Sequence, residues 1–204
     1  GAGFHAKAGE RHAEIVALDD ALAAAGDARG ATLYVTLEPC VHQGRTPPCV
    51  DRILHDGLAR VVVGAVDPNP KVHEKGIAKL RAAGVAVDVA QGPWADRCAA
   101  LIAPFASALV DKRAYTIVKI ASSLDGRIAT RTGASRFITG PGARAVVHRL
   151  RDAVDAVVVG AGTVLADDPS LTVRDVPGRN PRRVVVDRHH RTHAGATVYT
   201  RHIG

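Results

Sequence analysis

The sequence predicts an α/β protein, because short runs of β-branched residues alternate with stretches of helical periodicity. Residues 60–66 form an apolar run around three consecutive valines, as expected for a strand of a parallel sheet that is covered on both faces. Residues 13–25 place Ile15, Leu18 and Leu22 on one helical face, and a glycine follows. These two segments together indicate helices packed on a parallel sheet.

The rest of the first half continues this alternation. Two further strands are predicted at residues 31–37 and 85–89. Three further helices are predicted at residues 49–55, 76–83 and 94–109. A short charged segment at 110–113 then marks a boundary. We therefore expect a first domain at residues 1–108, a linker at 109–113 and a second domain at 114–204.

The second domain is expected to open with a strand at residues 115–121, followed by the turn sequence Ser-Ser-Leu-Asp-Gly at 122–126. A helix is predicted at residues 142–150. Three more strands are predicted at residues 156–159, 183–186 and 196–199. With only about 90 residues, this domain is small for a nucleotide-binding domain.

Composition and charge narrow the class of protein. The chain has 204 residues, of which 47% are apolar and 23% charged, and no apolar run approaches the ~20 residues that span a bilayer. A signal-peptide pattern is also missing, so we expect a cytoplasmic location. The net charge of +7 favours anionic partners, or reflects a plain bias toward arginine, because no Lys/Arg block stands out. The sequence has no methionine even at position 1, which predicts that it begins inside its natural protein.

Four residues of the first domain have the spacing of a catalytic zinc site. His12 and Glu14 open the first helix, Cys40 follows a proline at the end of a strand, and Cys49 opens the next helix. One imidazole and two thiolates leave the fourth tetrahedral position of Zn²⁺ open for water. Glu14 is then the group that moves protons between this water and a leaving amine. The pattern predicts a hydrolytic deaminase, with a structural zinc site or unrelated buried thiols as alternatives.

The spacing of the two cysteines distinguishes among deaminases. Deaminases of nucleic acids and nucleosides usually carry Pro-Cys-x-x-Cys, whereas eight residues separate Cys40 from Cys49. We expect this insertion to carry His42, Arg45 and Thr46 across the mouth of the site, where a cation and a hydroxyl suit a ribose phosphate. A tRNA-editing deaminase and a catalytically silent scaffold stay as alternatives. The favoured interpretation has no nucleic-acid partner and no membrane partner.

Several stretches resemble the bifunctional deaminase–reductases of riboflavin biosynthesis. The longest is Thr-Leu-Glu-Pro-Cys-Val-His-Gln-Gly-Arg-Thr-Pro-Pro-Cys at residues 36–49, and the second is Lys-Ile-Ala-Ser-Ser-Leu-Asp-Gly-Arg at 119–127. Shorter matches extend the resemblance to nearly the whole chain, at residues 12–14, 67–70, 164–169 and 171–174. The resemblance implies a cytidine-deaminase-like three-layer domain, followed by part of a dihydrofolate-reductase-like α/β domain.

In that family the first domain deaminates 2,5-diamino-6-ribosylamino-4(3H)-pyrimidinone 5′-phosphate, and the second uses NADPH to reduce the ribosyl chain to ribityl. The resemblance implies that Glu14 is the proton shuttle and that Zn²⁺ is bound by His12, Cys40 and Cys49. The implied NADPH contacts are Ala121, Phe137, Thr163 and Asp167. The implied substrate contacts are Ser135, Arg151, Leu171 and Arg174. The expected partners are this phosphorylated pyrimidine and further copies of the chain in a homo-oligomer.

The chain departs from the family pattern at several places. Phe137 stands where the family usually has tryptophan, and Glu74 stands where a glycine is common. The first helix and strand of the family would precede Gly1, and its reductase domain would continue beyond Gly204. We therefore expect a chain that is truncated at both ends, whose reductase activity depends on the missing part.

Overall fold

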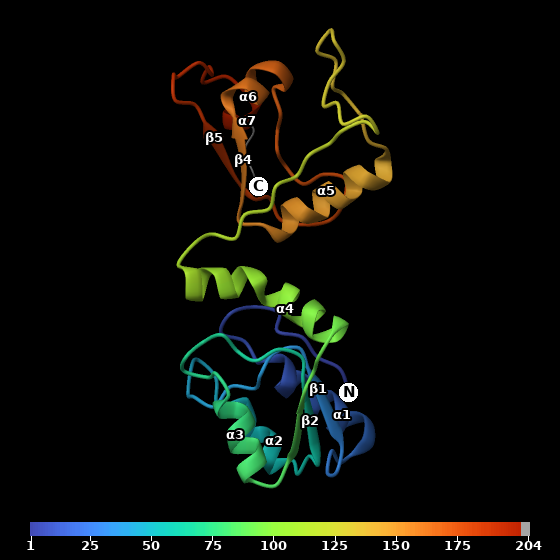
Figure 1. The fold of residues 1–204 in the computed structure, drawn as a ribbon, viewed down its shortest axis with the longest axis vertical. Helices are drawn as coiled ribbons and strands as arrows, with labels where there is room; N and C mark the ends of the chain where they lie inside the picture. The colour runs from blue at the N-terminus through green and yellow to red at the C-terminus, as the bar shows by residue number, and fades with distance from the viewer. Residues whose placement is uncertain (201–204) are drawn as a thin grey trace. The chain divides into compact units, whose positions relative to one another are not determined.

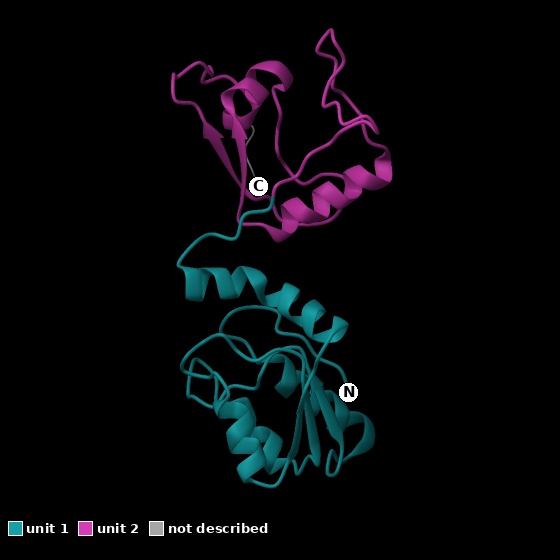
Figure 2. Cartoon of the chain, in the orientation of Figure 1, with its two compact units in different colours: residues 1–117 teal, residues 118–204 magenta. Residues whose placement is uncertain are grey.

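The computed structural model describes residues 1–200, and the chain divides into two compact units, residues 1–117 and 118–204 (Figure 1; Figure 2). The division follows Ile117, beyond the linker expected at 109–113. The last four positions of the predicted second domain, 201–204, lie outside the described residues. Within the described part of the chain, no helix is both long enough and apolar enough to span a membrane.

Unit 1 is built on a parallel three-stranded sheet in the order β1–β2–β3 (Figure 1). The strands are β1 (Thr32–Val35), β2 (Arg60–Val63) and β3 (Ala86–Val89). The central strand sets the register, since Val61 is paired with Leu33 on one side and with Val87 on the other. Because parallel neighbouring strands need a long crossover connection, a helix lies between each strand and the next along the chain.

The helices of unit 1 lie where the sequence predicts them. They are α1 (Ala13–Ala25), α2 (Cys49–His55), α3 (Lys75–Ala82) and α4 (Pro93–Ala106), the last continuing as a π-helical segment at Ser107–Asp111. The three predicted strands are also confirmed, but they end up to three residues early. Beyond the regular ladder the continuations of β1 and β2 still make a single bond, from the Glu38 N–H to the Ala65 carbonyl.

The core of unit 1 lies between β2 and the helices α2 and α3. Val61 and Val63 of β2, Ile53 of α2 and Leu80 of α3 are all fully buried. Because only 3% of the chain is aromatic, this core is aliphatic. Burying each such side chain contributes roughly 1.5–3 kcal/mol. The core therefore fixes the start of α2, where Cys49 lies.

Unit 2 contains a smaller parallel sheet. Its elements are α5 (Pro141–Ala153), β4 (Ala156–Gly160), α6 (Ala161–Asp167), β5 (Arg182–Val186) and α7 (Thr197–Thr200). β4 and β5 pair in parallel, with Val158 opposite Val184. The predicted helix at 142–150 and the predicted strands at 156–159 and 183–186 are thus confirmed. A small buried cluster of Val164, Leu171, Ala196 and Val198 joins α6 and α7 to the two strands, from which Val157, Val159 and Val185 pack against it.

Two predicted strands are wrong. Residues 115–121 have strand-like composition, but a strand needs a neighbour for its N–H and C=O groups, and within residues 1–200 this segment pairs with none. Residues 197–199 instead form the start of α7, and Ala196 precedes the helix. Thr197 donates from its N–H and its hydroxyl to the Asp168 carboxylate, at 2.7 and 2.6 Å, so a residue distant in sequence caps this turn.

Candidate functional site

Three predicted metal ligands come together in unit 1. His12 is the residue before α1, Cys40 lies beyond the carboxyl end of β1, and Cys49 is the first residue of α2. The Nδ1 atom of His12 lies 3.2 Å from the Cys49 sulfur and 3.6 Å from the Cys40 sulfur. All three ligand atoms lie within 4.8 Å of one another, and no other such group occurs among residues 1–200. The structure thus gathers these side chains at the carboxyl edge of the sheet, where open α/β sheets bind ligands.

The arrangement fits a zinc ion. Zn–N bonds of about 2.0–2.1 Å and Zn–S bonds of about 2.3 Å at tetrahedral angles place a nitrogen and a sulfur ligand about 3.5 Å apart. The two N···S distances, 3.2 and 3.6 Å, bracket that value. The distances also identify Nδ1 as the ligand atom of His12. Three protein ligands of this kind are typical of a catalytic zinc with one open position.

The two sulfur atoms share protons unequally. The Cys49 thiol and the Cys49 N–H both donate toward the Cys40 sulfur, the latter at 3.3 Å, and lower the pKa of Cys40 to about 5 against the effect of its burial. The same thiol–thiolate contact, together with burial, raises the pKa of Cys49. One sulfur is therefore anionic at neutral pH, and binding a cation would displace the remaining proton.

Glu14 lies beside the two sulfur atoms. It is the second residue of α1, and its half-buried carboxyl interacts with the Cys49 thiol. Burial is the largest influence on Glu14 and raises its pKa, and the negative charge of Cys40 adds to this. His12 and the Cys49 thiol act in the opposite direction. A carboxyl group that is easy to protonate thus lies next to the place where the three ligands meet.

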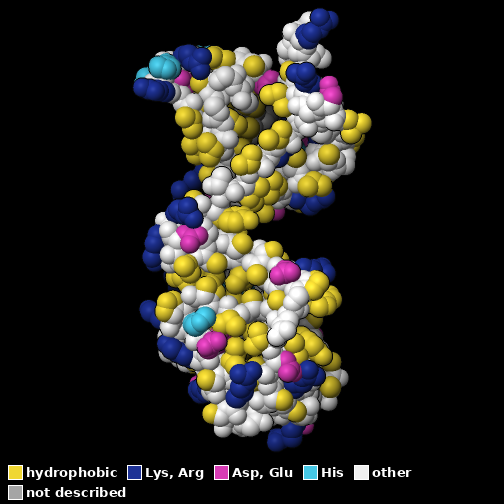
Figure 3. Space-filling model, viewed as in Figure 1, with side chains coloured by type: hydrophobic (Ala, Val, Ile, Leu, Met, Phe, Trp, Pro, Cys, Tyr) yellow, Lys and Arg dark blue, Asp and Glu magenta, His cyan; other side chains and the backbone are white. Residues whose placement is uncertain are grey.

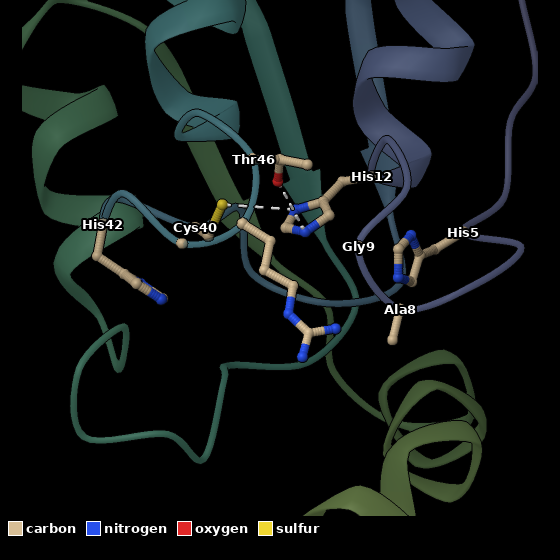
Figure 4. Close-up of a pocket in the computed structure, with 9 residues that line it drawn as sticks. His5, Ala8, Gly9, His12, Cys40, His42 and Thr46 are labelled. Atoms are coloured by element: carbon tan, nitrogen blue, oxygen red, sulfur yellow. Dashed lines mark hydrogen bonds between the residues drawn. The ribbon is translucent and has the colours of Figure 1, made fainter.

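A pocket of about 420 Å³ opens over these ligands (Figure 4). Its walls come from the segment before α1 and from the loop between the two cysteines. The lining residues are His5, Ala8, Gly9, His12, Cys40, His42, Gly44, Arg45 and Thr46. His42 and Arg45 line it as expected. The volume is in the range of small-molecule sites.

His5 is a pocket residue that sequence reasoning missed. Its ring meets the His12 ring edge-on with 5.2 Å between centroids, and its Nδ1 is 3.0 Å from the Arg11 carbonyl oxygen. The segment before α1 has no helical or strand periodicity. A single histidine in such a segment gave no signal, because only the folded backbone brings it back to the site.

Glu38 is a second residue that sequence reasoning missed. Its carboxylate is buried, with 3% of the residue exposed, and accepts four main-chain N–H groups at 2.8–3.3 Å. The donors are Asp67, Glu74, Gly76 and Ile77. Gly76 also needs its missing side chain, since a Cβ there would lie 2.2 Å from the Pro39 carbonyl oxygen. Glu38 thus joins the beginning of α3 to the turn that carries Cys40.

The implied substrate contacts of unit 2 lie partly together. Arg151 on α5 donates to the Thr172 carbonyl at 2.9 Å, and the Arg174 side chain donates to the Ser170 hydroxyl at 2.9 Å. Leu171, which lies between these two arginines in the sequence, is buried. Ser135 lies in the irregular segment before α5. The structure therefore brings Arg151 to the 170–174 segment, which contains Arg174. That Ser135 joins them at a substrate site stays a prediction.

His148 organises this segment and was missed in the sequence. It is 3% exposed, its Nδ1 accepts the Arg174 N–H at 3.1 Å, and its Nε2 lies 3.4 Å from the Asp175 carboxylate. Burial, and then the charge of Arg151, lower the pKa of His148. His148 lies in the helix predicted at residues 142–150, and nothing in the sequence marked it as a site residue.

The implied NADPH contacts come from two segments. Thr163 and Asp167 lie on α6, which follows β4 directly, while Ala121 and Phe137 lie in the irregular stretch before α5. Phe137 is 72% exposed, and the Arg144 guanidinium lies 4.7 Å from its ring centroid. An exposed aromatic face beside a cation suits a planar, anionic cofactor. That these four residues meet around NADPH stays a prediction.

Comparison with known proteins gives two family matches. Residues 1–65 match the cytidine and deoxycytidylate deaminase zinc-binding region, and residues 114–203 match the RibD C-terminal domain. The two matched regions follow one another along the chain, and the predicted fold of each part is confirmed.

Similar proteins and structures agree with this. The riboflavin biosynthesis protein RibD of Aquifex aeolicus is 49% identical over 188 residues, which are 92% of this chain and 51% of that protein. RibD of Escherichia coli is 46% identical over 85% of this chain and 46% of its own length.

Among solved structures, a diaminohydroxyphosphoribosylaminopyrimidine deaminase/5-amino-6-(5-phosphoribosylamino)uracil reductase from Thermotoga maritima has a TM-score of 0.82 at 45% identity, covering 92% of this chain and 52% of that one. RibD of Acinetobacter baumannii has a TM-score of 0.78 at 43% identity, covering 96% and 55%. The chain spans about half the length of the relatives that it matches.

Proposed function

We propose, from the premise that the chain belongs with the RibD proteins in both of its units, that unit 1 is a zinc-dependent deaminase and unit 2 is part of an NADPH-dependent reductase. One observation carries the proposal for unit 1. The nitrogen and two sulfurs of His12, Cys40 and Cys49 lie within 4.8 Å of one another, with the Glu14 carboxyl beside them.

The chemistry of unit 1 follows from these groups. Bound zinc would supply Lewis-acid activation of the water that attacks the amino-bearing ring carbon. Glu14 accepts a proton from that water and delivers it to a ring nitrogen. It then takes the second proton, from the hydroxyl now on the ring carbon, and passes it to the amine, which leaves as ammonia while the carbonyl forms. Burial, which raises the pKa of Glu14, makes the same carboxyl able to hold and release this proton.

The proposed substrate is 2,5-diamino-6-ribosylamino-4(3H)-pyrimidinone 5′-phosphate. The Thermotoga structure bears the name of a deaminase of this phosphoribosylaminopyrimidine class. The pocket of about 420 Å³ has room for such a molecule, and Arg45 supplies a cation at its wall for the phosphate. The nucleic-acid alternative is disfavoured by the long loop between the cysteines. On the face shown in Figure 3, basic side chains are spread over both units rather than gathered in one patch.

For unit 2 we propose reduction of the ribosyl chain with NADPH, in the full-length protein. Arg151 and Arg174 meet at the 170–174 segment and would bind the substrate phosphate. The exposed ring of Phe137 would stack on the cofactor. Assembly into a homo-oligomer and a cytoplasmic location stay predictions.

A direct assay tests the proposal. The purified chain should contain about one zinc per polypeptide and release ammonia from the phosphorylated diaminopyrimidine. Release from a tRNA substrate, with binding that weakens steeply as salt rises, would instead support the nucleic-acid deaminase. A zinc-loaded chain that releases no ammonia would indicate the silent scaffold. Oxidation of NADPH by the deaminated product, measured with the full-length protein, tests the proposal for unit 2.

A further inference from the structure

The Thr46 hydroxyl contacts the ligand histidine on the side away from the metal position. Its Oγ1 atom lies 3.3 Å from Nε2 of His12, while the other ring nitrogen of His12 faces the two sulfur atoms. Figure 4 shows the contacts of the imidazole to Thr46 and to Cys40 as dashed lines. The histidine is thus held between a metal position and a hydroxyl group.

The protonation of the ring decides what this hydroxyl does. A neutral imidazole that binds a cation through Nδ1 carries its proton on Nε2, so this N–H donates to Oγ1 of Thr46. Such a bond fixes both the tautomer and the plane of a ligand histidine, and removing outer partners of this kind typically weakens metal binding by about 10–100-fold.

The local backbone holds Thr46 in place. Its carbonyl accepts the Gly44 N–H at 3.2 Å, which folds the loop back on itself. Pro47 follows directly and restricts the backbone of the residue before it. Pro48 then precedes α2, whose Val50 N–H donates to the Cys40 carbonyl at 3.2 Å. The hydroxyl therefore sits on a short, constrained segment tied to both cysteines.

We propose that Thr46 is a positioning residue for His12, through which the loop between the cysteines orients the metal ligand. This inference rests on the proposed zinc site of unit 1. It differs from the sequence-based expectation that the Thr46 hydroxyl contacts the ribose phosphate. Arg45 and His42 are then the residues of the loop that are left to contact the substrate.

Zinc affinity of the full chain, measured by competition with a chromogenic chelator, tests the proposal without using turnover. Thr46→Val keeps the shape of the side chain and removes the hydroxyl, so we expect zinc affinity to fall by about tenfold or more. Thr46→Ser keeps the hydroxyl and should stay within about threefold of the wild type. Thr32→Val, on the exposed part of β1, is the matched control and should bind zinc as the wild type does.

A second readout is the visible spectrum of the Co²⁺-substituted protein, which reports on ligand geometry. It should change in Thr46→Val and be restored in Thr46→Ser. The proposal is overturned if Thr46→Val binds zinc as tightly as the wild type and only raises KM for the phosphorylated pyrimidine, since Thr46 would then be a substrate contact. A wild type that binds zinc but releases no ammonia contradicts the deaminase, while the loss of zinc affinity in Thr46→Val would still support the role of Thr46.

Discussion

The two units differ in how firmly the fold holds their candidate residues. In unit 1 the three metal ligands lie within 4.8 Å of one another, above a core whose central side chains, such as Val61 and Leu80, are fully buried. In unit 2 the buried cluster has four members, and the candidate cofactor contact Phe137 is 72% exposed. Candidate residues come together where they adjoin helices and strands that are packed against a hydrophobic core.

The difference follows from the positions of these residues in their elements. Cys49 begins a helix that buries Val50 and Ile53, so packing of α2 also places the thiol. Ala121 and Phe137 lie in a stretch that forms neither helix nor strand between residues 112 and 140. Without packed neighbours, a motif residue is placed by its local backbone alone.

The largest expected effect separates chemistry from structure in unit 1. Glu14→Gln keeps the size of the side chain but cannot carry the proton, so ammonia release should fall by about 10²–10⁴-fold. Zinc content, measured by atomic absorption, should stay the same. Glu10→Gln, at an exposed position just before α1, is the control and should keep full activity. Retained deamination in Glu14→Gln would refute the assigned proton shuttle.

The next effect tests whether Glu38 makes unit 1 the firmer unit. In Glu38→Gln an amide replaces one carboxylate oxygen and faces buried N–H donors, such as that of Gly76. Leaving such donors unpaired should lower the free energy of unfolding of unit 1 by about 3 kcal/mol. Thermal and urea unfolding measure this loss. Glu74→Gln is the control, because Glu74 contributes only its main-chain N–H to this network and its side chain is exposed. An equal loss in both variants would contradict the role of the Glu38 carboxylate.

The fold of unit 1 could be predicted largely from the sequence, because its strands and helices carry clear periodicity. Its metal site could be anticipated for a related reason. His12 and Cys49 adjoin the beginnings of helices, and Cys40 follows a strand, so the meeting point of parallel strand ends and helix starts was foreseeable. Glu38 was not foreseeable, since a charged residue in a strand-like run gives no sign that four N–H groups will surround it.

Unit 2 shows where sequence patterns fail. Residues 196–199 have strand-like composition, yet a bond from Thr197 to Asp168, 29 residues away, caps a helix that begins at Thr197. The 115–121 segment has the composition of a strand, but a neighbouring strand decides whether one forms. Both errors arise from contacts between residues distant in sequence, which local propensity does not contain.

A smaller effect concerns the pH dependence of unit 2. The pKa of His148 lies below its ordinary value of 6.5, so the unfolded chain binds this proton more readily. The stabilisation is present above pH 6.5 and is lost as the pH falls through the lower pKa of the folded state. Arg151 and Arg174 disfavour the proton, and Asp175 favours it.

His148→Asn removes this titration while its amide oxygen can still accept the Arg174 N–H. The variant should lose about 1–2 kcal/mol of stability at pH 8, because part of a buried side chain is deleted. Its stability between pH 5 and pH 7 should depend less on pH than that of the wild type, as urea unfolding at a series of pH values would measure. His189→Asn, at an exposed position, should leave the pH dependence unchanged. A steeper dependence in His148→Asn would contradict the assignment.

The smallest effect concerns a strained position in the firmer unit. Glu74 precedes α3 with a φ of 59°, a left-handed conformation that favours glycine, and glycine is the residue expected here from the family resemblance. Its N–H donates to Glu38 at 2.9 Å, so the backbone is held in this conformation. Glu74→Gly relieves the strain, whereas Glu74→Ala keeps it. We therefore expect the glycine variant to be more stable than the alanine variant by about 1 kcal/mol, after the greater flexibility of the unfolded glycine chain is counted. Equal stability of the two variants in urea unfolding would show that the Glu38 network holds Glu74 without strain.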